Sequence, residues 1–333
     1  MTTHNMVING RCFLRQMTGI ERYTHEIVKR LKANRMLQPN FNVNQIAGNL
    51  WEQISLPKQI KKNELLWSPA NAGPWMVKNQ VVTLHDASVF DHPEWFKPAF
   101  VAWTQLSWKI LSKQARAIIT VSNFSCERLK LHLGIPEYKI HVIYNGVGKP
   151  FECQPSEKVS EVKRKYALEK PYFLFVGTNE PRKNLAVLTQ AWQILNSHTH
   201  TLFIAGGEGT VFKKTDFSHQ NYVPDEDLPA LYAGATAHVI PTLYEGFGLT
   251  ALEAMACGTP VIASDIPIFR ELFKDEVLFS NPHDANELAI AMQKIIDHKS
   301  LADELREKGL HLAKKLSWDE TAHQTQTLLE SLQ

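Results

Sequence analysis

Short apolar runs alternate with amphipathic stretches along most of the chain. In the second half, four such runs are separated by helical patterns such as NLAVLTQAWQIL (184–195). Strands that alternate with helices of about ten residues favour parallel sheets built from βαβ units. The apolar runs are PYFLFVG (171–177), TLFIAGG (201–207), AHVIPTL (237–243) and PVIAS (260–264).

The first half shows the same alternation, so we predict an α/β chain with two doubly wound domains. Its predicted strands are residues 5–10, 81–86, 117–122 and 139–147, and residues 94–116 are predicted to form one long helix. The polar stretch 152–170 is the predicted junction. The expected domains are residues 1–152 and 153–315, and the final helix, 316–333, is expected to pack back across the junction.

Composition excludes several classes of protein. The 333 residues suffice for two cores, and no apolar run approaches the roughly eighteen residues of a membrane span. There is no signal-peptide pattern, and the four scattered cysteines predict small core residues in a reducing cytoplasm. Residues 1–150 carry 19 Lys and Arg against 9 Asp and Glu. This excess fits a polyanionic or membrane-surface partner, or ordinary variation between two surfaces; no nucleic-acid partner is expected.

The stretch YEGFGLTALEAMACGTPVIAS combines acidic residues with glycines between two apolar runs. Glu245 follows a predicted strand, and Gly246 and Gly248 allow a ligand to approach the backbone. A helix that starts near Leu249 directs its free N–H groups toward the same loop, which makes an anion site. Glu253 is predicted in the first turn, where it either favours the helix dipole or reaches a polyol such as ribose.

Two glutamates separated by seven residues, within this stretch, resemble the donor site of nucleotide-sugar-dependent retaining glycosyltransferases of the family-4 type. Those enzymes have the GT-B fold, in which two Rossmann-like domains face a central cleft. The resemblance extends over most of the chain. It includes GTNEPRKNL (177–185), YVPDEDLPALYAGA (222–235), TGIERYTHEI, LWSPAN, VVTLHDASVFDHPEWF, ITVSNFSCERL and VIYNGV.

The resemblance implies that Arg182 and Lys183 stabilise the leaving diphosphate; from the residues alone, an exposed basic turn is the alternative. Thr178 stands where many relatives carry a further arginine, whose task Arg182 would take over. Members of the fold usually act without a metal, so no metal and no cofactor are expected. The D-x-D at Asp225 is interpreted as a helix N-cap.

Further roles follow from the same resemblance. Glu245 is expected to hold the hydroxyls of the donor sugar rather than act as a nucleophile, and Gly19 is expected to contact the diphosphate through its backbone. His85 is expected to face the donor sugar or to steer the incoming hydroxyl; a satisfied core histidine is the alternative. The remaining expected donor-binding residues are Glu253, Gly246, Phe247, Gly248, Leu249, Thr250, Val223, Asn145 and Ser122.

We expect a retaining transferase that moves a hexose, preferably mannose from GDP-mannose, to a glycan or lipid-linked acceptor in surface-polysaccharide assembly. UDP-linked hexoses, a sugar-nucleotide 2-epimerase and a non-catalytic sugar-nucleotide binder remain alternatives. A dinucleotide dehydrogenase is disfavoured because no GxGxxG follows a strand.

The segment 92–116 is rich in aromatic and basic residues. It predicts either peripheral contact with anionic headgroups and a lipid-linked acceptor at the inner face of the membrane, or a core helix with a solvated basic side. Its aromatic residues are Trp95, Phe96, Phe100, Trp103 and Trp108.

Overall fold

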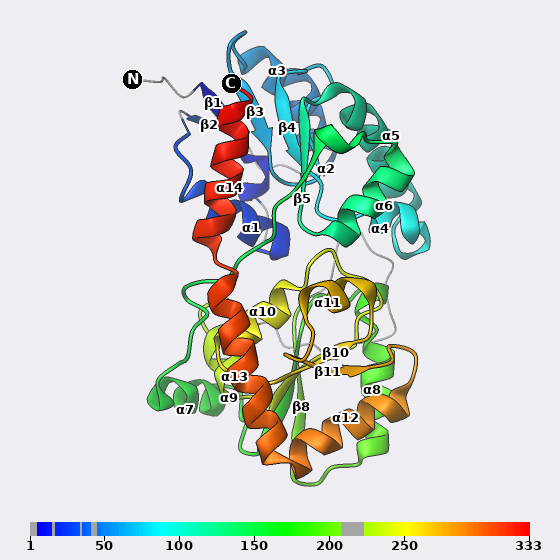
Figure 1. Cartoon of the computed structure of the whole chain (residues 1–333), viewed down its shortest axis with the longest axis vertical. Helices are drawn as coiled ribbons and strands as arrows, with labels where there is room; N and C mark the ends of the chain where they lie inside the picture. The colour runs from blue at the N-terminus through cyan, green and yellow to red at the C-terminus, as the bar shows by residue number, and fades with distance from the viewer. Residues whose placement is uncertain (1–4, 15–16, 34, 41–44, 208–222) are drawn as a thin grey trace. The chain divides into compact units, whose positions relative to one another are not determined.

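The computed structural model describes residues 5–14, 17–33, 35–40, 45–207 and 223–333 (Figure 1). They form two compact units. The N-terminal unit contains the residues up to Pro93, residues 98–145 and residues 318–333, and the C-terminal unit contains residues 94–97 and 146–317. The chain therefore changes unit near 145/146 and 317/318, a few residues from the expected boundaries at 152/153 and 315/316.

The N-terminal unit is built on a parallel six-stranded sheet in the order β2-β1-β3-β4-β5-β6. Every residue of β1, β3, β4 and β5 is buried, as expected for parallel strands covered on both faces. The strands are β1 (Met6–Asn9), β2 (Arg35–Leu37), β3 (Leu65–Ser68), β4 (Gln80–Thr83), β5 (Ala117–Thr120) and β6 (Ile140–Val142).

Helices of the first 145 residues connect these strands, and the last helix of the chain, α14 (Trp318–Ser331), packs with them. Trp318 meets Tyr23 of α1 edge to face at 6.3 Å, and Thr321 Oγ1 donates to the carbonyl of Tyr144 at 2.8 Å. The other helices are η1 (Gly10–Leu14), α1 (Gly19–Val28), α2 (Gln45–Leu50), the π-helical η2 (Trp51–Ser55), α3 (Leu56–Gln59), α4 (Ser88–Asp91), η3 (Pro93–Trp95), α5 (Pro98–Gln114), α6 (Asn123–Leu133) and η4 (Glu137–Lys139).

The C-terminal unit is built on a parallel five-stranded sheet in the order β11-β10-β9-β7-β8. Its strands are β7 (Tyr172–Val176), β8 (Thr201–Ala205), β9 (Ala237–Ile240), β10 (Val261–Ser264) and β11 (Leu278–Ser280). Its helices are α7 (Ser156–Lys165), η5 (Pro181–Lys183), α8 (Leu185–Leu195), α9 (Leu228–Gly234), α10 (Leu249–Ala256), α11 (Pro267–Leu272), α12 (Ala285–Asp297) and α13 (Lys299–Lys315).

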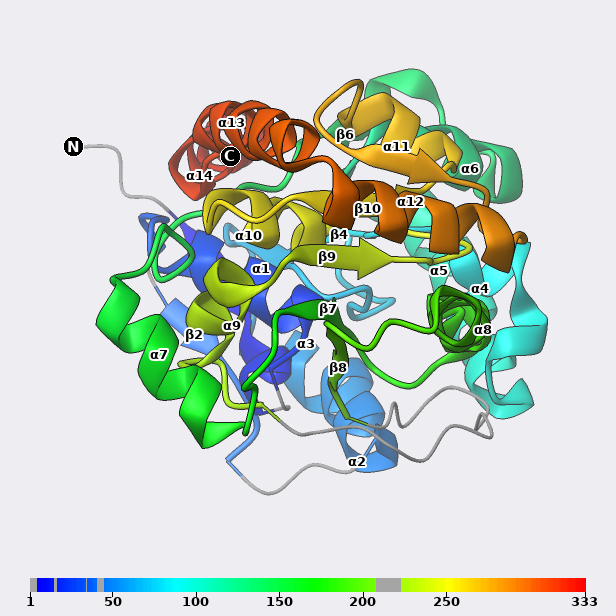
Figure 2. The same ribbon diagram turned by 90° about the horizontal axis from the view of Figure 1, so that it is seen from below.

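One core of the C-terminal unit lies where α8 and α12 cover the sheet together (Figure 2). Phe173 and Phe175 of β7, Val239 of β9 and Ile262 of β10 pack there against Leu188 of α8. Phe173 and Phe175 are two residues apart, so they project from the same face of β7.

The prediction of two doubly wound domains is confirmed, and four details are wrong. The predicted junction 152–170 contains α7, and the predicted helix 94–116 is divided into η3 and α5. The helix whose N-cap was predicted at Asp225 begins only at Leu228. Of the four free cysteines, Cys153 is exposed rather than a core residue. No helix within the described ranges is both long enough and apolar enough to cross a membrane.

Candidate functional site

Two loops meet at the carboxyl ends of β7 and β9, which are neighbours in the sheet. The carbonyl of Arg182 accepts from Leu243 N at 2.7 Å and from Thr242 Oγ1 at 2.9 Å. Asn184 Nδ2 donates to the carbonyl of Pro241 at 2.9 Å. The loop after β7 is therefore fixed to the loop after β9, at the sheet edge where open α/β sheets bind ligands.

Asn184 is the residue that shapes the first of these loops. Its φ of 56° lies in the left-handed region, which asparagine tolerates better than most residues. Its side chain also donates to the carbonyl of Pro282 at 2.7 Å, so it joins three segments. The sequence prediction did not include Asn184. Its position directly before the apolar helix that starts at Leu185 was the available signal.

Glu245 lies at the centre of this junction and is buried. Its Oε1 is 2.6 Å from Lys183 Nζ, and its Oε2 is 2.9 Å from Arg182 Nη1. Burial by itself would raise the pKa of this carboxyl, but the charges of Lys183 and Arg182 lower it to about 2. The structure thus brings the predicted carboxylate and both predicted cations together, and Glu245 is ionised at neutral pH.

Glu180 is a second buried acid beside Arg182, and sequence reasoning missed it. Its Oε1 lies 2.9 Å from Arg182 Nη2, as an ion pair without hydrogen-bond geometry. Among the described residues, neither of its oxygens has a hydrogen-bond partner. Arg182 is therefore held between Glu180 and Glu245, and the acid directly before Pro181 in NEPRKN was the available signal.

The glycine-containing loop leads from Glu245 into α10. Gly248 has a φ of 110°, and a Cβ there would lie 2.7 Å from Cε1 of Phe269. A side chain at this position would therefore strain the backbone and collide with a buried ring. No side chain caps the N-terminus of α10, where Leu249 and Thr250 form the half-buried first turn. Gly246 and Phe247 are buried in the loop.

Glu253 lies in the second turn of α10, so the prediction that it occupies the first turn is wrong. The helix begins at Leu249, which places Glu253 fifth, too far along to favour the positive end of the dipole. The side chain is buried and accepts from Tyr232 Oη at 3.3 Å. Its contact with a ribose stays a prediction.

The segment before α9 also differs from expectation. The N-cap position of α9 is Asp227 rather than Asp225, and its side chain does not cap the helix. Asp227 Oδ2 instead accepts from Lys165 Nζ at 2.6 Å and from Tyr166 Oη at 2.8 Å. Val223 is buried just before it, and Tyr222, which opens the resembling segment, lies outside the described residues.

His85 follows β4 in the N-terminal unit and is buried. Its Nε2 is 2.9 Å from the carbonyl of Pro69, so Nε2 carries the proton, and the ring meets Tyr23 edge to face at 4.7 Å. Burial lowers its pKa, although the Pro69 contact and Asp86 act in the opposite direction. His85 is therefore a neutral imidazole whose Nδ1 is unprotonated.

Three other predicted residues of this unit are placed as follows. Gly19 is the exposed first residue of α1. Ser122 is fully buried, and its Oγ accepts from Ser125 N at 3.0 Å as the N-cap of α6. Asn145 is buried, and its Oδ1 has no hydrogen-bond partner within the described ranges. Their contacts with a donor stay predictions.

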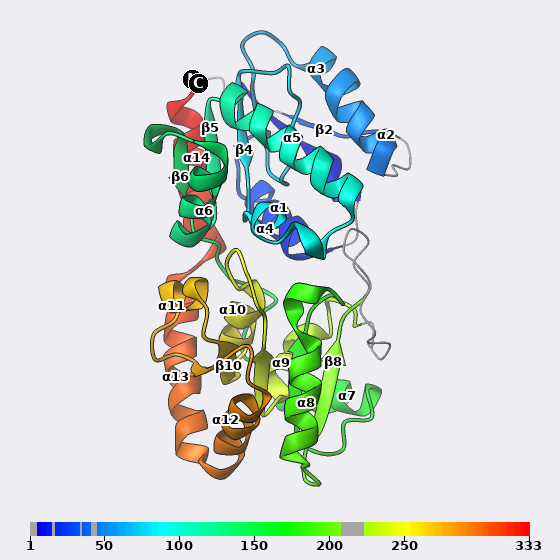
Figure 3. The ribbon, with the colours of Figure 1, turned by 90° about the vertical axis from the view of Figure 1, so that its right-hand side faces the viewer.

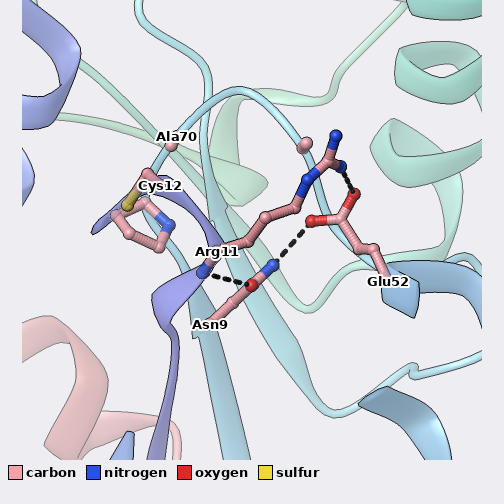
Figure 4. Close-up of a pocket in the computed structure, with 7 residues that line it drawn as sticks. Asn9, Arg11, Cys12, Glu52 and Ala70 are labelled. Atoms are coloured by element: carbon pink, nitrogen blue, oxygen red, sulfur yellow. Dashed lines mark hydrogen bonds and ion pairs between the residues drawn. The ribbon is translucent and has the colours of Figure 1, made fainter. Parts of the chain in front are cut away.

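A small polar pocket of about 10 Å³ lies at the end of β1 (Figure 4). Arg11 Nη1 is 2.9 Å from Glu52 Oε2, and Asn9 Nδ2 donates to Glu52 Oε1 at 2.7 Å. The pocket is large enough for about one water molecule and too small for a sugar. We interpret this group as a buried charge pair that fixes η2 to β1.

Comparisons with known proteins identify the family and the fold of this chain. Residues 158–311 match the family model described as "Glycosyl transferases group 1", and residues 62–148 match "Glycosyltransferase Family 4". The O-antigen chain mannosyltransferase B of Escherichia coli is 33% identical over 267 residues, which cover 76% of this chain and 70% of that protein. The O-antigen chain mannosyltransferase RfbU of Salmonella typhimurium is 29% identical over 232 residues, covering 66% of this chain and 62% of that protein, which is less than two thirds of its length.

Among solved structures, Anabaena Alr3699/HepE in complex with UDP and glucose is similar in fold. Its TM-score is 0.77 at 14% identity, and the match covers 98% of this chain and 100% of that chain. Both parallel sheets are therefore those of the GT-B fold. The chain belongs to the family-4 glycosyltransferases.

Proposed function

We propose that this glycosyltransferase transfers mannose from GDP-mannose, with retention of configuration, to a glycan or lipid-linked glycan in polysaccharide biosynthesis. The observation that carries the proposal is the ionised Glu245 between Arg182 and Lys183, next to the uncapped start of α10. The names of the two O-antigen mannosyltransferases support mannose and this class of product.

The cations and the helix start would receive the diphosphate. Breaking the bond between the anomeric carbon and the phosphate oxygen leaves negative charge on the leaving group. Arg182 can hold phosphate oxygens bidentately, Lys183 supplies a point charge, and the N–H groups of α10 add their positive dipole end. These groups supply the charge stabilisation without a metal, and we propose that the enzyme is metal-independent.

Glu245 would bind the sugar rather than attack it. Both of its oxygens already lie within 3 Å of a cation, which holds the carboxylate in place and lowers its nucleophilicity. It remains able to accept hydrogen bonds from sugar hydroxyls. The acceptor oxygen then bonds to the anomeric carbon on the face that the phosphate leaves, and the proton of the acceptor hydroxyl passes to the departing phosphate oxygen.

Two further groups fit binding roles. Glu253 would accept hydrogen bonds from the ribose hydroxyls, while Tyr232 fixes its orientation. In the N-terminal unit, the unprotonated Nδ1 of His85 would accept from a hydroxyl of the donor sugar or of the acceptor, because Nε2 is engaged with Pro69.

The test is a transfer assay with the purified chain, an oligomannose acceptor and a panel of GDP- and UDP-sugars. We expect nucleotide release and product only with GDP-mannose, activity that persists in EDTA, and a product with the α-anomeric configuration of the donor by NMR. If product forms only with a UDP-hexose, that sugar nucleotide and not GDP-mannose is the donor. A product with inverted anomeric configuration would overturn the retaining mechanism. An epimerised sugar from donor without acceptor would favour the 2-epimerase, and saturable binding without turnover would favour a non-catalytic binder.

A further inference from the structure

Cys153 and Cys257 lie far apart in the sequence but on adjoining segments of the C-terminal unit. A Cβ added to Gly258, the neighbour of Cys257, would lie 3.4 Å from Cys153 Sγ. Because a C–C single bond is about 1.5 Å long, that sulfur lies within about 5 Å of Gly258 Cα. The backbone of Glu152, the neighbour of Cys153, forms a hydrogen bond with the Cys257 thiol. Each cysteine is thus adjacent to the chain neighbour of the other.

The position of Cys257 follows from how α10 ends. Gly258 has a left-handed φ of 76°, and its N–H donates to the carbonyl of Met255 at 3.0 Å. Thr259 N donates to the carbonyl of Ala254 at 2.9 Å. These two bonds form a Schellman motif, which favours glycine directly after the C-cap. Cys257 is therefore the C-cap residue, and its side chain is buried.

Neighbouring helices hold this end of α10 in place. Figures 2 and 3 show α10 between α9 and α13, and it contacts both. Arg306 Nε of α13 donates to the carbonyl of Gly258 at 2.8 Å. Thr259 Oγ1 donates to the carbonyl of Tyr232 on α9 at 2.6 Å. The segment that contains Cys257 is therefore fixed from two sides.

The segment that carries Cys153 is attached to the same part of the unit. Phe151 is buried, and its ring meets that of Tyr232 edge to face at 6.0 Å. Gln154 Nε2 donates to the carbonyl of Glu152 at 2.8 Å, within the same turn. Cys153 itself is exposed. The segment is thus anchored through Phe151, while the Cys153 thiol is open to reagents in solution.

The different environments of the two thiols give them different roles. A cysteine attacks a disulfide as its thiolate and needs access to it, so exchange begins at the exposed Cys153. Cys257 is only 3% exposed, and burial, with the charges of Glu253 and Cys153, raises the pKa of its thiol. Cys257 is therefore shielded from external reagents and reacts only with a sulfur that is already beside it.

We propose that Cys153 and Cys257 form a thiol–disulfide switch that reacts with low-molecular-weight disulfides. The thiolate of Cys153 attacks one sulfur of the small disulfide, whose S–S bond breaks and whose other half leaves and takes up a proton. The thiolate of Cys257 then attacks the Cys153 sulfur, and the second half leaves in the same way. The two cysteines are oxidised to one disulfide, and the small disulfide is reduced to two thiols that carry the two protons lost by the cysteines.

The bond joins the end of α10 to the segment before α7. A disulfide places two Cα atoms about 4.4–6.8 Å apart, which suits residues whose chain neighbours adjoin as these do. It closes a loop of roughly 100 residues and stabilises the unit by constraining its unfolded chain. Glu253 lies one turn before Cys257, so the bond also anchors the helix that begins at the candidate site. This inference does not depend on the donor or on the proposed transfer reaction.

The experiment follows the reaction of the full chain with oxidised glutathione by intact-mass spectrometry, after reduction and removal of the reductant. Wild type should lose two hydrogen atoms in mass and keep no glutathionyl group. Digestion without reductant should yield the peptides of Cys153 and Cys257 joined to each other. Oxidised wild type should melt at a higher temperature than reduced wild type, and dithiothreitol should reverse both changes.

Three variants separate the steps, after circular dichroism has shown that each is folded. Cys257→Ala should keep a glutathionyl group on Cys153 and lose it at least about 10-fold more slowly than wild type, because the adjacent thiol is gone. Cys153→Ser should gain neither a glutathionyl group nor a disulfide. The control Cys126→Ala replaces a buried cysteine of the N-terminal unit and should react as wild type does.

Four results would overturn the proposal. The first is a glutathionyl group that stays on Cys153 of wild type, and the second is a disulfide between two copies of the chain on a non-reducing gel. The third is oxidised wild type that melts no higher than reduced wild type. The fourth is Cys257 that takes up glutathione in Cys153→Ser as fast as Cys153 does in Cys257→Ala.

Discussion

Replacing Glu245 by glutamine removes one charge and keeps the shape of the side chain. Glu245 is buried within 2.9 Å of both Arg182 and Lys183, and Lys183 is itself buried. Lowering the pKa of this carboxyl from 4.5 to about 2 corresponds to about 3 kcal/mol of stability at pH 7. Removing one partner of a buried pair has a similar cost, about 3–5 kcal/mol.

We therefore expect the Glu245→Gln variant to lose about 3 kcal/mol in free energy of unfolding at pH 7, measured by urea denaturation. The sign of the pH dependence follows from the lowered pKa. The contribution of Glu245 is complete above pH 4.5 and is lost as pH falls toward 2, so the difference from wild type should shrink by about 1 kcal/mol between pH 7 and pH 4. A variant as stable as wild type at pH 7 would refute this account of the ion pairs.

A diphosphate should partly replace the missing charge. Pyrophosphate or GDP, at equal concentration, should raise the thermal midpoint more in Glu245→Gln than in wild type, because the anion compensates the charge that Arg182 and Lys183 no longer share with Glu245. The rate of transfer should nevertheless fall about 100-fold, since the ionised group that holds the sugar is gone. Near-normal turnover would contradict the catalytic importance of this charge. The control is Asp265→Asn at the exposed pair with Arg270, which should cost less than about 1 kcal/mol.

Three other predictions concern buried groups. Burial lowers the pKa of His238 to about 3, so the contribution of the neutral imidazole to stability is complete above pH 6.5 and is lost as pH falls. Between pH 7 and pH 5, the unfolding free energy of His238→Gln should therefore decline by about 2 kcal/mol less than that of wild type. Urea denaturation at several pH values measures this, and an equal decline in both proteins would contradict it. Gly248→Ala should lower the unfolding free energy by about 1–3 kcal/mol, because the backbone has a positive φ and the new Cβ would collide with Phe269. The control Gly134→Ala also has a positive φ but no atom within 4 Å of the new Cβ, so it should cost less. Equal thermal midpoints for the two variants would count against the steric argument. Arg11→Met should lower the unfolding free energy by about 3–5 kcal/mol, because Glu52 stays buried without its cationic partner. The double variant Arg11→Met/Glu52→Gln should recover part of that loss. Equal denaturation midpoints for the single and double variants would show that the ion pair is not the cause.

Strong periodicity made most of the fold predictable from the sequence. PYFLFV and NLAVLTQAWQIL correspond to β7 and α8 almost residue for residue. The stretch that contains α7 was interpreted as the junction because it is polar, and in the structure only Val162 of the ten residues of α7 is buried. No element was predicted over the α2–η2–α3 segment, which consists of short helical pieces that include the π-helical turn η2.

The candidate site was predicted in part, for a physical reason. Glu245, Arg182 and Lys183 are charged residues at strand ends, where sequence position indicates location. The importance of Glu180 and Asn184 depends instead on how the loop folds: Glu180 is turned inward against Arg182, and Asn184 adopts a left-handed conformation. The start of α10 near Leu249 was predicted, but Glu253 is the fifth residue of the helix and therefore lies in its second turn rather than in its first.

The return of α14 to the N-terminal unit has a consequence for biosynthesis. Residues 146–317, one continuous stretch, form nearly all of the C-terminal unit. The N-terminal unit also includes residues 318–333, so the contact between Tyr23 and Trp318 can form only after the end of the chain has been translated. During synthesis, the C-terminal unit should therefore reach its native fold before the N-terminal unit is complete.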